Sequence, residues 1–319
     1  MLYTIVEDQS GESVIMQSTN PKNIMRLIVG LILAATIIVL PGCQLPWSKS
    51  HNTATKAPQV SAPSLDDDEV EQAVKSSLPA GAVLIAPLNP EGTEAVQTED
   101  MDNDGTREII AAYSMGEKRK AEAYAMILKQ KNNTWEKIWQ SGPSGYEIDC
   151  AIPADVTGDG RNELLMGWTL GASVGNGLDI LSLKNGKVDK LYSTGYHKME
   201  LLNEAEDGDK RVALALWQKD TGEAFQVDVY RWDGQRLAAA SEFYPDYFEK
   251  VVEYYEPLVK ETPDDAFYWY YLADAQIRVG NKVDARDSIN KGMSLHKGYP
   301  ALGRFQQLQK RAQADDDKS

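Results

Sequence analysis

The chain has 319 residues, of which 42% are hydrophobic, and this apolar fraction excludes a wholly disordered or collagen-like protein. Its 33 basic and 48 acidic side chains give a formal net charge of −15, which repels phosphate backbones and predicts no nucleic-acid partner. The two cysteines are too few for a disulfide scaffold.

An uncharged apolar run over residues 27–40 follows Lys22 and Arg26. As a helix it would cover only ~21 Å at ~1.5 Å per residue, whereas the hydrocarbon core of a membrane is ~30 Å thick. The run therefore predicts a signal peptide over residues 1–43. An uncleaved single-pass anchor and a buried core helix are the alternatives. Residues 1–24 carry acidic side chains that do not suit a signal peptide, so Met25 is an alternative start.

The end of this run, Leu40-Pro41-Gly42-Cys43, resembles the lipobox of bacterial lipoproteins, although proline is not usual two residues before the cysteine. The resemblance implies that Cys43 is lipidated and becomes the first residue after cleavage. It also implies attachment to the cell membrane on the extracytoplasmic side. Residues 44–64 are rich in Ser, Thr, Pro, Lys and Ala and predict a flexible tether.

Residues 65–240 are predicted to form a β-repeat domain that begins with a short helix over Asp66 to Ser77, capped by Ser64. The signal is self-similarity, because an acidic loop followed by an apolar strand occurs twice and a divergent copy starts near Asn203. Each copy continues with two strands joined by a tight turn, and one strand precedes each loop. The turns are at Asn132-Asn133, Asn185-Gly186 and Asp233-Gly234. The fold class predicted is mainly β with an α-helical C-terminus, built on three four-stranded propeller-blade-like repeats.

The acidic loops have the residue types that bind an oxygen-seeking cation, and Ca²⁺ is the cofactor they predict. Without a cation, clustered carboxylates repel one another. In the second loop a threonine replaces one carboxylate, which predicts weaker binding. An acidic turn without an ion is the alternative for both loops. The predicted ligands are Asp100, Asp102, Asp104, Thr106 (backbone carbonyl) and Glu108 in the first loop, and Asp155, Thr157, Asp159, Arg161 (backbone carbonyl) and Glu163 in the second.

The third copy has Asn203, Ala205 and Arg211 at three ligand positions, and no metal is expected there. Over about residues 82–240 the pattern resembles the calcium loops of FG-GAP or VCBS repeats, the type found in integrin α propellers. Three repeats are fewer than the about four to eight that close a propeller. A partial or barrel-like assembly, or closure with help from residues 82–88 or a second chain, is therefore expected.

Residues 241–314 change to a helical period of about 3.6, with Pro257 expected to kink or split the first helix. The spacing of Trp269, Leu272 and Ala273 resembles a tetratricopeptide repeat over 266–295, with a half repeat before it. The resemblance implies a docking groove. The alternative is a helical cap over the open edge of the β repeats. Residues 315–319 predict an acidic tail.

Enzyme signatures are weak. Gly171 to Gly175 matches the nucleophile-elbow pattern around Ser173, but the segment is predicted to join two strands, and a triad would need His197 as base. Cys150 is predicted to be a buried structural thiol. The sequence therefore predicts a membrane-tethered, extracytoplasmic lipoprotein that acts as a non-catalytic, calcium-stabilised binding or scaffold module for an unidentified protein or glycan. The alternatives are a cell-envelope hydrolase without a recognisable motif and a tetratricopeptide-type docking adaptor.

Overall fold

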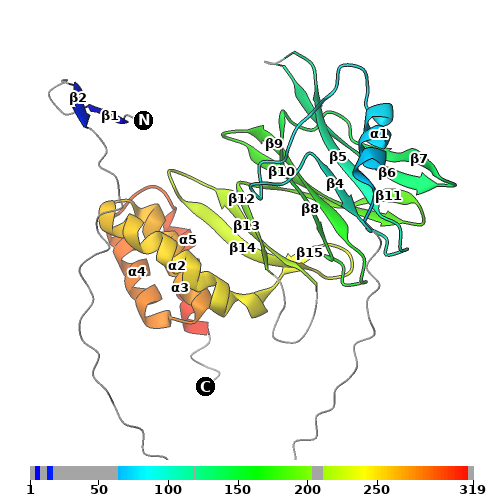
Figure 1. Cartoon of the computed structure of the whole chain (residues 1–319). Coiled ribbons are helices and arrows are strands. Elements are labelled where there is room, and N and C mark those ends of the chain that lie inside the picture. Colours follow the sequence, from blue (N-terminus) through cyan, green and yellow to red (C-terminus); the bar gives the residue numbers. More distant parts are fainter. Residues whose placement is uncertain (1–3, 8–12, 17–63, 118–119, 203–210, 315–319) are drawn as a thin grey trace, which may run out of the picture. The chain divides into compact units, whose positions relative to one another are not determined.

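A computed structural model describes residues 4–7, 13–16, 64–117, 120–202 and 211–314 (Figure 1). The chain divides into two units, Met1–Ala57 and Pro58–Ser319. The described part of the first unit is a hairpin of β1 (Thr4–Glu7) and β2 (Ser13–Met16). The apolar run, Cys43, most of the tether, positions 203–210 of the third copy and the acidic tail lie outside the described residues. Among the described helices, none combines the length and apolar character needed to cross a membrane.

The second unit contains three antiparallel sheets whose strands pair in chain order, as the sequence predicts (Figure 1). The first sheet contains β3 (Val83–Leu84), β4 (Val96–Glu99), β5 (Glu108–Met115), β6 (Glu122–Lys131) and β7 (Thr134–Gln140). The short β3 and β4 pair with the same edge of β5. The second contains β8 (Glu147–Ala154), β9 (Glu163–Gly171), β10 (Gly175–Lys184) and β11 (Lys187–Tyr196). The third contains β12 (Lys198–Leu202), β13 (Ala213–Lys219), β14 (Phe225–Trp232) and β15 (Leu237–Ala239).

The hairpin turns form where the sequence predicts them. Asn132 and Asn133 have φ of 50° and 61° between β6 and β7, and Asn185 and Gly186 have φ of 54° and 71° between β10 and β11. Two-residue turns that match the right-handed twist of the strands need positive φ at both positions, which asparagine and glycine tolerate best. These residues therefore set the register of the outer strands.

The three sheets pack face to face. Neighbouring side chains of a strand point to opposite faces, so Leu164 and Leu165 of β9 enter different cores. Leu164 packs with Ile110 and Ile127 of the first sheet, whereas Leu165 packs with residues of the third sheet such as Leu214. The second sheet is thus buried on both faces, which explains the apolar run 164–168 within β9.

Helices cover the two outer faces of this stack. On the first sheet, Ala73 and Val74 of α1 (Asp67–Ser77) pack in one core with Tyr113 and Met126. On the third sheet, α2 (Tyr244–Glu261) and α3 (Ala266–Val279) form one core with β13 and β14. The described residues form no closed propeller ring, because helices lie where further blades would pack. The helices cover a sheet face and not the predicted open edge.

Two local expectations about helices are wrong: the cap of the first helix, and a split of the first C-terminal helix at Pro257. The N-terminal cap of α1 is Asp66 and not Ser64, because the Asp66 carboxylate accepts hydrogen bonds from the backbone N–H groups of Asp68 and Glu69 at 3.1 and 3.3 Å. Pro257 lies inside α2 and does not split it. The apolar face of α2 is held by its packing on the third sheet, which outweighs the single backbone hydrogen bond that proline removes.

After a short 3-10 helix, η2 (Ser241–Phe243), the C-terminal region contains α2, α3, α4 (Lys282–Ser294) and α5 (Leu302–Ala314), in which consecutive helices contact each other. Gly280, with φ of 93°, ends α3. An ion network ties α3 to the third sheet. The Arg278 guanidinium lies 2.9 Å from Asp228 of β14 and 3.0 Å from Asp274 of its own helix. The helical region is therefore joined to the sheets by polar as well as apolar contacts.

Candidate functional site

The first acidic loop connects β4 to β5 and is folded around its first aspartate. The Asp100 carboxylate accepts hydrogen bonds from the backbone N–H groups of Asp104 and Gly105, both at 3.0 Å. Asp104 in turn accepts one from the Thr106 N–H at 2.9 Å. Gly105 has φ of 88°, a conformation that favours glycine, so the loop can turn sharply here. The turn brings the loop's carboxylates together.

Three of the predicted ligands in this loop form a cluster. Asp100, Asp102 and Glu108 each offer a carboxylate oxygen, and these oxygens lie within 4.8 Å of one another. Glu108 is completely buried and accepts a hydrogen bond from the Met101 N–H at 2.9 Å. The donor set is one that a hard cation prefers, as the sequence predicts.

A lysine that sequence reasoning missed lies in this cluster. The Lys129 ammonium on β6 is 3.1 Å from Asp102 and 3.0 Å from Asp104, and it also donates to Glu108. The pairing of β5 with β6 explains its position. Ile109 is opposite Leu128, so Lys129, the next residue on β6, lies beside Glu108. The signal in the sequence is a single lysine directly after the apolar run 125–128.

Burial and pairing shift the pKa values of this pair. Burial raises the pKa of Glu108 to about 7, although the hydrogen bond from Lys129 acts to lower it. Burial lowers the pKa of Lys129, but the carboxylates of Glu108, Asp104 and Asp102 outweigh this effect and hold it above its usual value. Lys129 is therefore a positive charge in the position where the sequence predicts Ca²⁺.

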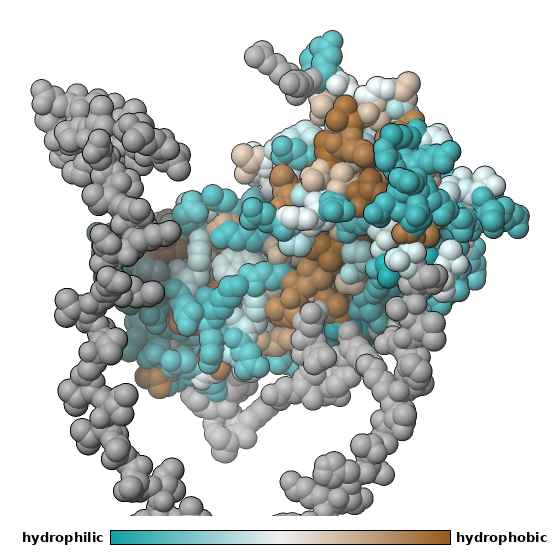
Figure 2. All heavy atoms as spheres, viewed as in Figure 1, coloured by the Kyte–Doolittle hydropathy of each residue, from teal (hydrophilic) through white to brown (hydrophobic). Residues whose placement is uncertain are grey.

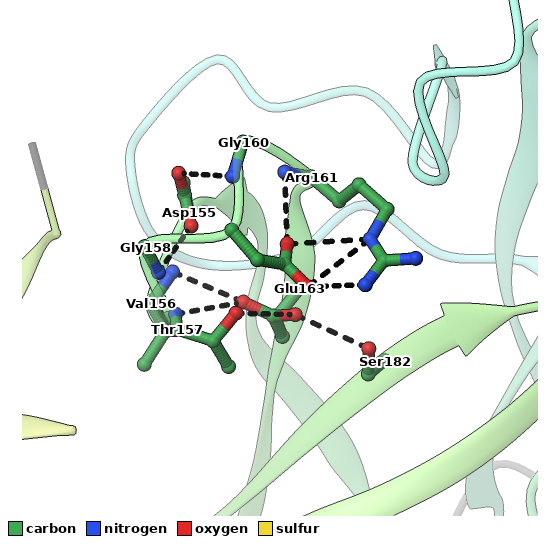
Figure 3. A network of polar contacts seen from close by, with 9 residues as sticks. Asp155, Val156, Thr157, Gly158, Gly160, Arg161, Glu163 and Ser182 are labelled. Carbon is green, nitrogen blue, oxygen red and sulfur yellow. Dashed lines mark hydrogen bonds and ion pairs between the residues drawn. The ribbon is translucent and has the colours of Figure 1, made fainter. Parts of the chain in front are cut away.

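The second acidic loop connects β8 to β9 and repeats the same backbone geometry (Figure 3). Asp155 accepts hydrogen bonds from the N–H groups of Gly158 and Gly160, at 2.6 and 3.0 Å. Glu163, only 1% exposed, accepts from the N–H groups of Val156 and Thr157, at 3.1 and 3.0 Å. Figure 3 shows these donors converging on the two carboxylates from the loop itself.

The residue equivalent to Lys129 is a serine in this second loop. Leu164 pairs with Leu181 as Ile109 pairs with Leu128, so Ser182 occupies the matching position and donates to Glu163 at 3.2 Å. Among the described residues, the contacts of Glu163 are hydrogen bonds, and none is an ion pair. Burial raises the pKa of Glu163. The second loop therefore has a buried carboxylate without the ammonium that its counterpart has.

Arginines lie around the second loop. Arg161 pairs with Asp159 on the exposed side. Arg211, which follows the undescribed part of the third copy, donates to the backbone carbonyl of Trp232 at 2.7 Å. Its side chain also lies against Gly158, where an added Cβ would be 2.3 Å from the Arg211 Cγ. Arg211 is therefore part of the wall of the second loop, while positions 203 and 205 of the third copy lie outside the described residues.

The residues of the enzyme-like signatures all lie in the described part of the chain. Ser173 lies in the hairpin between β9 and β10, as predicted, whereas a nucleophile elbow joins a strand to a helix. His197 follows β11, and its Nδ1 accepts a hydrogen bond from the Lys219 N–H at 3.1 Å. Cys150 is buried, and burial raises its pKa to about 12, so it is a thiol at neutral pH.

The cavity nearest to such groups has a volume of about 560 Å³ and is lined by Asp149, Cys150, Tyr196 and His197 among others. Asp149 accepts hydrogen bonds from Tyr196 and from the Asn89 side-chain amide, the latter at 2.9 Å. These partners hold the carboxylate within the wall of the cavity.

A comparison with protein-family models and a comparison with curated proteins each give no match to this chain.

Proposed function

We propose that this chain is a non-catalytic binding or scaffold module, tethered to the cell membrane through lipidated Cys43 on the extracytoplasmic side and stabilised by Ca²⁺. The observation that carries the proposal is the pair of acidic loops, which precede equivalent strands, β5 and β9, of two successive sheets. In both, an aspartate is bound by loop N–H groups and a buried glutamate lies at the start of the next strand. This arrangement supports the likeness to FG-GAP and VCBS repeats.

Calcium suits the second loop best. Asp155, Thr157, Asp159, Glu163 and the Arg161 carbonyl would hold the ion, since these oxygens match the hard, flexible donor set that Ca²⁺ prefers. A bound cation would supply beside Glu163 the positive charge that Lys129 supplies beside Glu108. A threonine in place of one carboxylate lowers the affinity expected for Ca²⁺, and a low affinity is sufficient at the concentrations of calcium found outside cells.

Two surface features support a binding role. Apolar side chains form patches among hydrophilic ones on the face shown in Figure 2. Val83 is 62% exposed, and Leu84 and Leu88 of the same segment are also exposed. Exposed apolar groups of this kind mark interaction surfaces when they cluster. We propose an unidentified protein or glycan as the partner.

The C-terminal helices fit a capping role better than a docking groove. The tetratricopeptide-like pair is α3 and α4, with α2 as the preceding half repeat. One face of α2 and α3 is occupied by the third sheet, with Tyr255 and Phe248 fully buried there. A docking adaptor would need this face for a ligand. The hydrolase alternative would use the cavity beside Cys150, whose sulfur is a neutral thiol.

Replacing Cys43 by serine tests the tether. The wild-type chain is expected to leave the membrane only in detergent, with an intact mass that begins at Cys43 and includes acyl chains. Cys43→Ser cannot form the thioether, so the full precursor should accumulate and the acylated species should disappear. Ser48→Ala in the same tether should process normally. A wild-type mass that retains residues 27–40 would contradict lipidation and favour a single-pass anchor.

A further inference from the structure

The first acidic loop already contains a cation of its own. The Lys129 ammonium contacts three carboxylates, those of Asp102, Asp104 and Glu108. The lysine side chain is 10% exposed and Glu108 is completely buried, so water contributes little to balancing these charges. At this depth an unpaired charge is costly, and a lysine with three carboxylate partners is retained because the pairing offsets that cost.

We propose that Lys129 is the built-in cation of the first repeat, which makes this loop independent of metal and leaves the second loop as the calcium-responsive one. The proposal rests on the proposed function only in treating both loops as cation-binding turns. It differs from the expectation that the first loop, with more carboxylates, binds Ca²⁺ more tightly.

Geometry opposes joint occupancy by the ammonium and a metal ion. Ca²⁺ binds carboxylate oxygens at about 2.3–2.6 Å. The Lys129 nitrogen is already 3.0–3.1 Å from oxygens of Asp102 and Asp104. A divalent ion on the same oxygens would lie within contact distance of a like charge, so Ca²⁺ would have to expel Lys129 from its buried position. The donor set fits a cation, but the space for it is filled.

The chain provides an internal control for this idea. The two loops share a glycine N–H bond to the first aspartate and the buried glutamate, and besides Thr157 in place of Asp102 they differ at the residue opposite that glutamate. Lys129 occupies this position in the first repeat and Ser182 in the second. Exchanging the two residue types should therefore exchange the response to metal.

The experiment uses the purified full chain in a non-ionic detergent, with thermal melting measured in a chelator and in about 1 mM CaCl₂. Asp159→Ala first silences the second loop, and this variant should melt identically in both conditions. Adding Lys129→Ser should lower its melting temperature in chelator by about 5 °C or more, and Ca²⁺ should restore most of the loss. Adding Lys129→Arg, which keeps the charge, should leave melting insensitive to Ca²⁺.

Two outcomes would overturn the proposal. One is a double variant, Lys129→Ser with Asp159→Ala, that folds and ignores Ca²⁺. The other is calorimetric binding of Ca²⁺ by Asp159→Ala alone that disappears when Asp104→Ala is added, since the metal would then bind beside Lys129. This second measurement tests whether metal binds in the first loop even if the double variant does not fold. A wild-type chain that binds no Ca²⁺ would contradict the proposed calcium stabilisation. A gain of response to Ca²⁺ in Lys129→Ser would still support the role of Lys129 as the built-in cation.

Discussion

Replacing Arg278 by methionine is expected to lower the free energy of unfolding by about 3–5 kcal/mol, because it leaves the Asp228 carboxylate without its charge partner in a largely buried position and leaves Asp274 with Arg311 alone. Arg278 lies between Asp228 of β14 and Asp274 of α3, and its own side chain is 12% exposed. The guanidinium also lies over the rings of Tyr244 and Phe248, 4.7 and 4.8 Å from their centroids. The same substitution therefore removes ion pairs and cation–π contacts at the junction of sheet and helices.

Arg236→Met is the matched control. Arg236 is 74% exposed and its nitrogen lies 3.7 Å from Asp233, so the pair is worth at most about 1 kcal/mol. Urea unfolding followed by circular dichroism compares the two variants with wild type. If Arg278→Met and Arg236→Met unfold at the same urea concentration, α2 and α3 are not held to the third sheet by this network.

Replacing Gly167 by alanine is expected to cost about 3 kcal/mol through overpacking. A Cβ on Gly167 would lie 2.2 Å from the Tyr196 hydroxyl oxygen and 2.7 Å from the Cys150 sulfur. Tyr196 cannot move freely, because its hydroxyl donates to the buried Asp149 carboxylate. Relief of the clash would break that hydrogen bond, and the unpaired buried carboxylate would add to the cost.

Gly195→Ala is the control on the same sheet, since the nearest atom to its added Cβ is the Asn176 carbonyl oxygen at 3.7 Å. Its effect on unfolding should stay within about 1 kcal/mol. Thermal melting of the full chain measures both changes. Equal effects of the two substitutions would mean that the packing around Tyr196 adapts, and that the close approach at Gly167 is not required.

Much of the β architecture could be predicted from local signals. The turn residues Asn132, Asn133, Asn185 and Gly186 adopt positive φ angles, which asparagine and glycine tolerate best, and the strands on either side of each turn follow. The sheet order could be predicted because strands that follow one another in a chain usually pair with each other. The packing of α2 on the third sheet could not be predicted, because an apolar helix face does not identify the surface that it covers.

Lys129 shows why only part of the candidate site could be predicted from the sequence. The ligands within the loop are close in sequence, so their spacing alone predicts the cluster. Lys129 is 21 residues from Glu108 and reaches it through the pairing of β5 with β6. The connection between these strands, residues 116–121, has no turn signal that fixes the register. The residue opposite Glu108 could therefore not be named from the sequence.

The measurement that tests calcium stabilisation most directly is melting of the full chain in chelator and in about 1 mM Ca²⁺. A site with a Kd of about 10 μM would add about 2.7 kcal/mol to the folded state and raise the melting temperature by several degrees. The account predicts this rise in wild type and in Asp104→Ala, which alters the first loop, and its loss in Asp159→Ala, which alters the same position of the second. Identical melting of the wild-type chain in the two conditions would contradict it.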